Sequence, residues 1–348
     1  MRCICLVQSP LQAINATEAA HFFGCTDVTY VTIKWDKRPN NHRQTLAQIP
    51  PNSHVMTLLR DDTNSFTAVN YYASVLPVLN KLNADLLIIG DVRPYAFTDL
   101  ARSINAKTRV LVDDGTGTLV VYEYLVKSGK YYDLPKSSSP IRQAERDEQK
   151  RAMGIQVDAT PPYDLFTCFD LPETQATKVH HQPCARFVFT HHELNYKQIA
   201  IAGAPLVELN KLSLSDYLSA IAAMTKNKDV EYLYIPHRNE TKEKLDSLQE
   251  ALPVKLLPID RPIELWLKFH PNPPAKLYSI ISTCLWNIHE SQPSIQVKAF
   301  LPSRNAWQRG AQKEAWGIAG VTSVDSMLLI VDYFKNHLPH EEVSCHGN

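Results

Sequence analysis

The sequence has no excess of either charge, no long apolar run and no cysteine pair with CxxC spacing. Its 36 Lys and Arg residues balance its 36 Asp and Glu residues. Nucleic-acid-binding proteins usually carry a basic excess, so we expect no nucleic-acid partner. No stretch reaches the roughly 18 apolar residues of a membrane-spanning helix, and Gln8 interrupts the apolar start too early for a secretory signal. These absences predict a cytoplasmic protein and leave peripheral membrane contact open.

The seven cysteines show neither CxxC spacing nor an even number. Disulfides are rare in a reducing cytosol. Cys3 and Cys5 alternate within an apolar run, and we interpret them as buried thiols of a strand. Adjacent histidines occur at 180–181 and 191–192, but neighbouring side chains point in different directions and neither pair has zinc-site spacing. We therefore predict no metal site and no cofactor.

At 348 residues the chain is long for one domain and suits two. Apolar runs alternate with segments of helical spacing, which is typical of a parallel sheet with helices on both faces. The expected strands are residues 3–7, 28–33, 85–90, 109–112, 197–202, 231–235, 277–281 and 296–301. The expected helices are residues 11–23, 66–82, 98–104 (with Thr98 as N-cap), 214–224, 242–252, 262–269 and 323–337. We predict an α/β fold of two Rossmann-like domains facing a cleft, over residues 1–175 and 176–348, with the last helix a candidate to pack back on the first domain.

Polar residues follow several of these strands, at the ends where ligands bind in open parallel sheets. Asp113, Asp114 and Gly115 come directly after the strand 109–112. Transfer to a sugar hydroxyl needs a base that takes the proton, and repulsion between adjacent carboxylates can raise the pKa of one of them. Gly115 would allow a tight turn. The same residues are also a common turn composition, so alone this segment is explained as a loop.

In the second half, Pro236, His237 and Arg238 follow the strand 231–235. The imidazole and guanidinium groups could meet a phosphate, although a surface turn also explains them. Ser282 and Thr283 offer hydroxyls to phosphate oxygens or cap a helix, whose N-terminus would itself attract an anion.

Glu264 lies near the start of the helix 262–269. There it complements the helix dipole or accepts the ribose hydroxyls of a nucleotide. The sequence alone leaves both explanations open.

Together these clusters resemble the motifs of the bacterial sialyltransferases, in particular the lipooligosaccharide sialyltransferases and capsular polysialyltransferases. That family carries a D/E-D/E-G motif, a His-Pro motif and a Ser/Thr motif, and here Asp113, His237 and Ser282 follow in that order at similar spacing. Residues 8–16 and 203–208 resemble the opening segments of the family's two halves. One departure is that Arg238 replaces the proline, whereas a literal His-Pro begins at His270, after a helix rather than a strand.

The resemblance implies a GT-B type enzyme that transfers sialic acid from CMP-sialic acid to a glycan acceptor, with inversion and without a metal. It implies Asp113 as the base, with Asp114 as the alternative, and His237 as the group that assists departure of CMP. The donor contacts that it implies are Gly115, Gly203, Pro236, Arg238, Glu264, Ser282 and Thr283. The stretch 127–160 is the candidate for acceptor contact or a lid.

Three alternatives remain open at this point. The donor could be a related CMP-sugar such as Kdn, a legionaminic-type acid or Kdo. The chain could bind a nucleotide or glycan without turnover, or hydrolyse a sugar phosphate with a divalent cation. The acceptor (lipid-linked or not), the linkage, polymerisation and the oligomeric state are not predicted.

Overall fold

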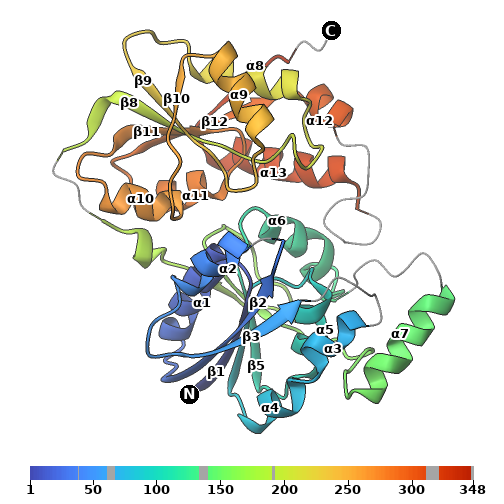
Figure 1. The fold of residues 1–348 in the computed structure, drawn as a ribbon. Coiled ribbons are helices and arrows are strands. Elements are labelled where there is room, and N and C mark those ends of the chain that lie inside the picture. The colour runs from blue at the N-terminus through green and yellow to red at the C-terminus, as the bar shows by residue number, and fades with distance from the viewer. Residues whose placement is uncertain (38, 61–66, 133–139, 190–192, 311–320, 346–348) are drawn as a thin grey trace. The chain divides into compact units, whose positions relative to one another are not determined.

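The computed structural model describes the chain except residues 38, 61–66, 133–139, 190–192, 311–320 and 346–348. The chain divides into two compact units, with the first extending from Met1 to Gln182 and the second beginning at Pro183. Each unit is an α/β domain built on its own parallel sheet (Figure 1). The predicted fold class, α/β with two Rossmann-like domains, is thereby confirmed.

The first unit contains a seven-stranded sheet in which neighbouring strands run parallel to one another. The strand order is β3 (His54–Arg60), β2 (Asp27–Trp35), β1 (Arg2–Val7), β4 (Leu86–Ile89), β5 (Thr108–Val112), β6 (Asp164–Thr167) and β7 (Val179–His181). The chain therefore moves outward from β1 to β3, returns, and continues outward from β4. This reversal places the topological switch point, where such sheets bind ligands, between β1 and β4.

The helices of this unit connect successive strands. They are α1 (Pro10–Phe22), α2 (Pro39–Leu46), α3 (Thr67–Ala73), α4 (Leu76–Lys81), α5 (Tyr95–Ser103), α6 (Gly117–Val121), the π-helix η1 (Tyr122–Val126) and α7 (Pro140–Ala152). Alanines of α1 pack closely on the buried strand residues of β1, including Cys3 and Cys5. All seven cysteines are free thiols, and Cys3 and Cys5 are buried in β1.

The predicted cap at Thr98 is wrong. The helix α5 begins earlier, at Tyr95, with Pro94 at the N-cap position. The Thr98 hydroxyl instead donates to the Val92 carbonyl oxygen from inside the first turn. The fixed φ of proline suits the start of a helix. The helix therefore begins directly after Pro94 and not after Thr98.

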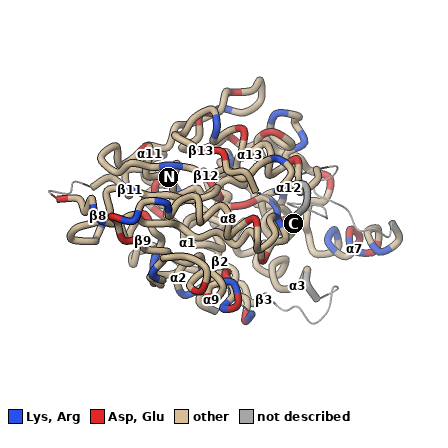
Figure 2. Tube along the Cα trace, turned by 90° about the horizontal axis from the view of Figure 1, so that it is seen from above, with Lys and Arg blue, Asp and Glu red and all other residues tan. Residues whose placement is uncertain are grey.

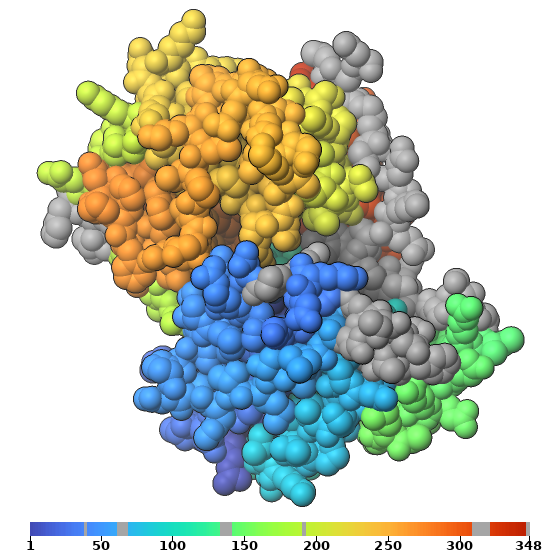
Figure 3. Space-filling view, in the orientation of Figure 1, coloured from blue at the N-terminus to red at the C-terminus, as the bar shows by residue number. Residues whose placement is uncertain are grey.

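The stretch 127–160, expected to contact the acceptor or act as a lid, contains α7, while its residues 133–139 lie outside the described part. This helix carries charges of both signs (Figure 2) and lies at the surface of the first unit (Figure 3). A buried ion pair of 2.8 Å between Lys150 and Asp99 ties α7 to α5. The helix is thus anchored to the body of its own unit by this pair, and Gln149 adds a hydrogen bond of 3.3 Å to Asn70 of α3.

The second unit contains a six-stranded parallel sheet. Its order is β10 (Val254–Leu256), β9 (Glu231–Ile235), β8 (Asn195–Ala202), β11 (Pro274–Ser279), β12 (Gln296–Pro302) and β13 (His340–Val343). Its helices are the 3-10 helix η2 (Ala185–Phe187), α8 (Leu214–Met224), α9 (Lys242–Ala251), α10 (Ile263–Phe269), α11 (Thr283–Ser291), α12 (Arg304–Gly310) and α13 (Ser323–His337). The switch point of this sheet lies between β8 and β11. Within the described residues, no helix combines the length and apolarity needed to cross a membrane.

Candidate functional site

The predicted site residues lie beyond the carboxyl ends of strands in both units. In the first unit, Asp113 and Asp114 follow β5. This strand pairs with β4, which is one of the two strands that flank the switch point. In the second unit, Gly203 follows β8, and Ser282 lies after β11 at the other side of the switch point. Each unit therefore carries polar groups at the edge of the sheet where a ligand is expected.

Asp113 is buried, with a relative exposure of 1%. One carboxylate oxygen accepts a hydrogen bond of 2.8 Å from the backbone N–H of Cys168, while the other has no partner among the described residues. Burial raises the pKa of the Asp113 carboxyl, and the Cys168 bond partly opposes this shift. The cause differs from the expected one, since burial raises the pKa of Asp113, whereas repulsion between adjacent carboxylates was expected to do so.

Asp114 is the member of the pair that reaches solvent, with 25% of its side chain exposed. Its carboxylate accepts a hydrogen bond of 2.7 Å from the Gln12 amide and forms an ion pair with Arg93. Gly115 follows with a φ of +64°, a left-handed conformation that glycine adopts without strain. The turn thus buries one carboxylate and presents the other.

Arg93 links two carboxylates at this edge. It holds Asp91 through two hydrogen bonds of 2.7 and 2.9 Å and also contacts Asp114. A side chain at Gly117 would come within 2.9 Å of the guanidinium group, so glycine leaves room for Arg93. Burial lowers the pKa of the Arg93 guanidinium, but the adjacent Asp91 and Asp114 carboxylates raise it by more, so its pKa lies above the ordinary value and Arg93 stays charged.

Gln12, Asp91 and Arg93 are site residues that were not predicted from the sequence. A signal was available, because Asp91 and Arg93 follow the apolar strand 85–90 in the same way that Asp113 follows its strand. Gln12 gave a weaker signal, as a polar residue within an apolar helix. Gly90 leaves room for the Gln12 side chain, because a Cβ atom at position 90 would lie 2.7 Å from the Gln12 amide oxygen.

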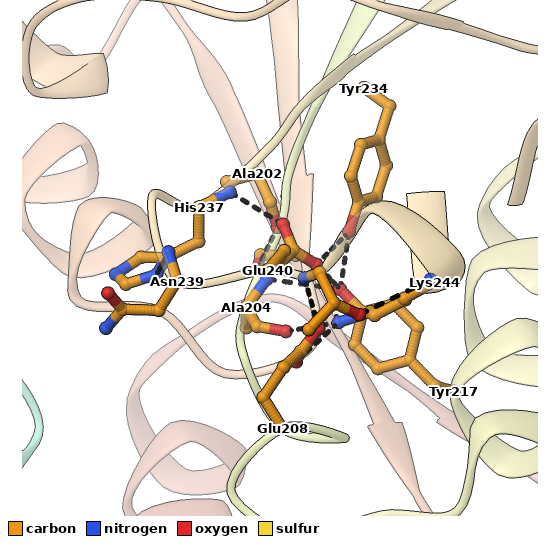
Figure 4. A network of polar contacts seen from close by, with 11 residues as sticks. Ala202, Ala204, Glu208, Tyr217, Tyr234, His237, Asn239, Glu240 and Lys244 are labelled. Carbon is orange, nitrogen blue, oxygen red and sulfur yellow. Dashed lines mark hydrogen bonds and ion pairs between the residues drawn. The ribbon is translucent and has the colours of Figure 1, made fainter. Parts of the chain in front are cut away.

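His237 lies in the turn after β9, and its ring geometry fixes its tautomer (Figure 4). The backbone N–H of Asn239 donates to Nδ1 of His237 over 3.2 Å. Because Nδ1 accepts this bond, the neutral ring carries its proton on Nε2. Burial, together with the nearby charges of Arg238 and Lys244, lowers the pKa of His237 to about 4. At neutral pH the side chain is therefore a neutral hydrogen-bond donor.

The neighbours of His237 differ in exposure. Pro236 is half-buried, whereas Arg238 is exposed. Gly203 is buried beside this turn, and its N–H donates to the Ile235 carbonyl oxygen over 2.9 Å. The loops after β8 and β9 thus meet at the same edge of the sheet.

Ser282 occupies the N-cap position of α11, but its hydroxyl makes no capping hydrogen bond to the helix backbone. The hydroxyl lies 3.1 Å from the Cys284 sulfur. The predicted capping role of the side chain is therefore wrong, while the position at the helix start is right. Both Ser282 and Thr283 are half-buried, at a helix end whose partial positive charge suits an anion.

Glu264 lies in the first turn of α10 and is buried, at 5% exposure. Asn287 of α11 donates to it over 2.8 Å, and burial raises the pKa of the carboxyl. Its charge in turn helps to raise the pKa of the Cys284 thiol, which the Ser282 hydroxyl also contacts. The structure thus brings Glu264 and Ser282 together around Cys284.

The remaining histidines do not form a metal site within the described residues, where no group of three or more metal-ligating side chains occurs. His180 lies 3.6 Å from Asp164, and residues 191–192 are outside the described part. His270, of the literal His-Pro pair, follows α10 as predicted and accepts from the Asn272 N–H over 3.1 Å. It remains the second candidate for the role of His237.

No protein-family model matches the chain, and no curated protein matches it by sequence. Solved structures of similar fold cover almost the whole chain at low identity. UDP-GlcNAc 2-epimerase from Neisseria meningitidis, bound to UDP-GlcNAc, has 13% identity and a TM-score of 0.48, with 98% of this chain and 95% of that chain covered. Arabidopsis thaliana UGT89C1 complexed with UDP-L-rhamnose has 11% identity and a TM-score of 0.48, with coverages of 99% and 85%. The Escherichia coli heptosyltransferase WaaC with ADP-2-deoxy-2-fluoro heptose has 11% identity and a TM-score of 0.43, with coverages of 95% and 99%.

Proposed function

We propose that this chain is an inverting glycosyltransferase that moves sialic acid from CMP-sialic acid to a hydroxyl of a glycan acceptor. The observation that supports the proposal is that carboxylate, imidazole and hydroxyl side chains lie beyond the carboxyl ends of strands in each sheet. Asp114 lies there in the first unit, and His237 and Ser282 lie there in the second. The choice of CMP-sialic acid rests on the resemblance of these motifs to those of the bacterial sialyltransferases.

The second unit would bind the donor. The Nε2–H of His237 would donate to the phosphate of CMP, and Ser282 and Thr283 would bind other phosphate oxygens with the α11 N-terminus behind them. Because the second ionisation of a phosphate monoester has a pKa of about 6, the departing CMP needs a hydrogen bond rather than a full proton. A neutral His237 suits this task.

Glu264 would accept hydroxyls of the ribose from its buried position beside Cys284. Arg238 is exposed next to His237 and would add positive charge near the phosphate. Gly203 would let the loop after β8 approach the nucleotide closely.

The first unit would activate the acceptor. The acceptor oxygen attacks the anomeric carbon as the bond from that carbon to the CMP phosphate breaks, and the hydroxyl proton passes to a carboxylate. We assign this proton transfer to Asp114 because a base must reach the hydroxyl, and Asp113 is buried. Asp113 becomes a buried neighbour that supports the turn. The transition state resembles an oxocarbenium ion, as in other glycosyl chemistry.

Release of CMP tests the proposal without a known acceptor. Purified protein is incubated with CMP-sialic acid, CMP-Kdn, a CMP-legionaminic-type acid, CMP-Kdo and UDP-GlcNAc, with and without EDTA and with a panel of glycans. We expect turnover of CMP-sialic acid that persists in EDTA and falls by at least ~100-fold in His237→Ala, the low end for a lost hydrogen-bond donor to developing charge.

Each other outcome identifies a different function. CMP binding without turnover of any donor would indicate a binding protein. Loss of activity in EDTA would favour a cation-dependent hydrolase. Turnover of a different CMP-sugar would replace sialic acid by that sugar, and turnover of UDP-GlcNAc alone would overturn the CMP assignment.

A further inference from the structure

A buried charged cluster lies beneath the His237 turn in the second unit (Figure 4). We call it the Glu240 cluster, and its members are Glu208, Tyr217, Tyr234, Glu240 and Lys244. The side chains of Glu240 and Lys244 are 0% and 2% exposed and form an ion pair of 2.6 Å. The Tyr234 hydroxyl donates to Glu240 over 2.6 Å, and the Lys244 ammonium lies 3.5 Å from the centre of the Tyr217 ring. The carboxylate of Glu240 is therefore fixed from several sides.

The Glu240 carboxylate also holds the backbone of the His237 turn. The N–H of His237 donates to Glu240 over 2.6 Å, and the N–H of Glu240 donates back to the His237 carbonyl oxygen over 2.9 Å. These reciprocal bonds close the turn of residues 237–240. The turn in turn places the Asn239 N–H on Nδ1 of His237.

The cluster connects the same turn to the loop after β8. Lys244 donates to the Ala204 carbonyl oxygen over 2.7 Å, and the Ala204 N–H donates to the Tyr217 hydroxyl over 3.1 Å. Glu208 from this loop accepts from the N–H of Thr241 over 2.9 Å. Gly203 packs so closely that a side chain there would collide with the Glu240 carboxylate. One ion pair thus joins both loops that border the proposed phosphate site.

We propose that Glu240 is a positioning residue, whose buried carboxylate fixes the His237 turn and thereby aims the Nε2–H of His237 at the donor phosphate. The inference rests on the proposed function for the identity of the target and on the structure for the geometry. Glu240 touches no substrate in this role. It acts through the backbone of His237 and through the bond from Asn239 to Nδ1.

Burial of the Glu240 charge costs desolvation free energy, and side-chain packing alone would not require a charged residue at this position. A buried ion pair can often be replaced by apolar side chains without loss of stability. A carboxylate accepts several hydrogen bonds at once. Here the two oxygens of Glu240 accept from the Tyr234 hydroxyl, the Lys244 ammonium and the His237 N–H. An apolar residue at position 240 would leave the His237 N–H without this partner.

The experiment measures the ring of His237 directly. Nitrogen-15 chemical shifts of histidine-labelled full-length protein report which ring nitrogen carries the proton, and the His237→Ala variant assigns the signal. We expect Nε2–H in the wild type and a mixture of tautomers in Glu240→Gln. Glu243→Gln, on an exposed side chain in the first turn of the adjacent helix α9, is the matched control and should leave the ring unchanged. An unchanged tautomer in Glu240→Gln would overturn the proposal.

A double-mutant cycle tests the same coupling in activity. We expect Glu240→Gln to lower CMP release at least ~10-fold in the wild type but by less than about 2-fold in a His237→Ala background, because positioning acts only through His237. Equal losses in both backgrounds would show an independent structural role and overturn the proposal. If His237→Ala leaves turnover intact, the proposed role of His237 fails, and the ring measurement alone then decides the positioning role.

Should Glu240→Gln not fold, Tyr234→Phe replaces it. This variant removes one hydroxyl from Glu240 and keeps the ion pair with Lys244. We expect a smaller change of the His237 tautomer ratio in the same direction. No change would count against the proposal.

Discussion

Gln12 donates its side-chain amide to the Asp114 carboxylate over 2.7 Å, although the two residues are 102 positions apart in the chain. The amide oxygen of Gln12 is held as well, because it accepts from the Gln8 N–H over 2.8 Å. The start of α1 therefore orients the carboxylate that follows β5. This contact makes Asp114 a fixed group at the sheet edge rather than a mobile loop side chain.

The two carboxylates should differ in their effect on activity. We expect Asp114→Asn to lower glycosyl transfer by ~10²–10⁴-fold, the range for a lost acid-base group, and Asp113→Asn to have a smaller effect. The reason is access, since Asp114 is partly exposed and Asp113 is buried. Rates are compared at equal folded fraction, with the exposed Asp158→Asn as control. A larger loss in Asp113→Asn would return the base role to Asp113.

His237 should make stability depend on pH between neutrality and pH 4. Its pKa of about 4 in the folded protein lies below its ordinary value of 6.5, so the unfolded chain binds the proton more readily. The stability contributed by the neutral ring is complete above pH 6.5 and is lost as the pH falls toward 4. We expect wild type to lose more unfolding free energy than His237→Gln between pH 7 and pH 4.5. Thermal unfolding of both proteins across this range gives the comparison, and parallel curves would contradict the expectation.

Two lysines on α9 should differ sharply in their contribution to stability. Lys244→Met leaves the Glu240 carboxylate buried without its cation, which costs about 3–5 kcal/mol for a buried pair. Lys242→Met removes an exposed pair with Asp246 and should leave stability nearly unchanged, because solvent screens exposed ion pairs. Urea unfolding of the two variants measures the difference. Equal effects would mean that Lys244 is solvated in solution.

Gly203 should not tolerate a side chain. A methyl group at this position would lie 2.8 Å from the Tyr234 hydroxyl and closer still to Glu240. We expect Gly203→Ala to lower the unfolding free energy by about 1–3 kcal/mol, as for overpacking, and to disturb CMP binding. Gly129→Asn is the control, because that position is open and has a φ of +68° that asparagine tolerates. Unfolding midpoints and CMP titrations of both variants provide the test, and wild-type behaviour of Gly203→Ala would show that the loop rearranges.

Strand positions were accessible from sequence because parallel strands are buried on both faces and so form continuous apolar runs. The runs at β1, β4 and β5 predicted their strands closely. Strands with mixed composition were missed, such as β3, whose Leu59 is 66% exposed at the sheet edge. The expected strand 277–281 instead spans Pro274–Ser279, since its pairing with β8 begins at Pro274.

The sequence by itself determined the α/β class and the occurrence of Asp113, His237 and Ser282 after strands, because apolar runs and turn residues are local signals. Only the tertiary structure decided which side chains are buried. The spacing of four residues is the same for Glu240 with Lys244 and for Asp246 with Lys242, so the spacing does not distinguish the two pairs. In the fold, the first pair is 0% and 2% exposed and the second is 48% and 81% exposed. The difference arises because the loops after β8 and β9 close over one side of α9, and that contact between distant segments is not encoded in any local pattern.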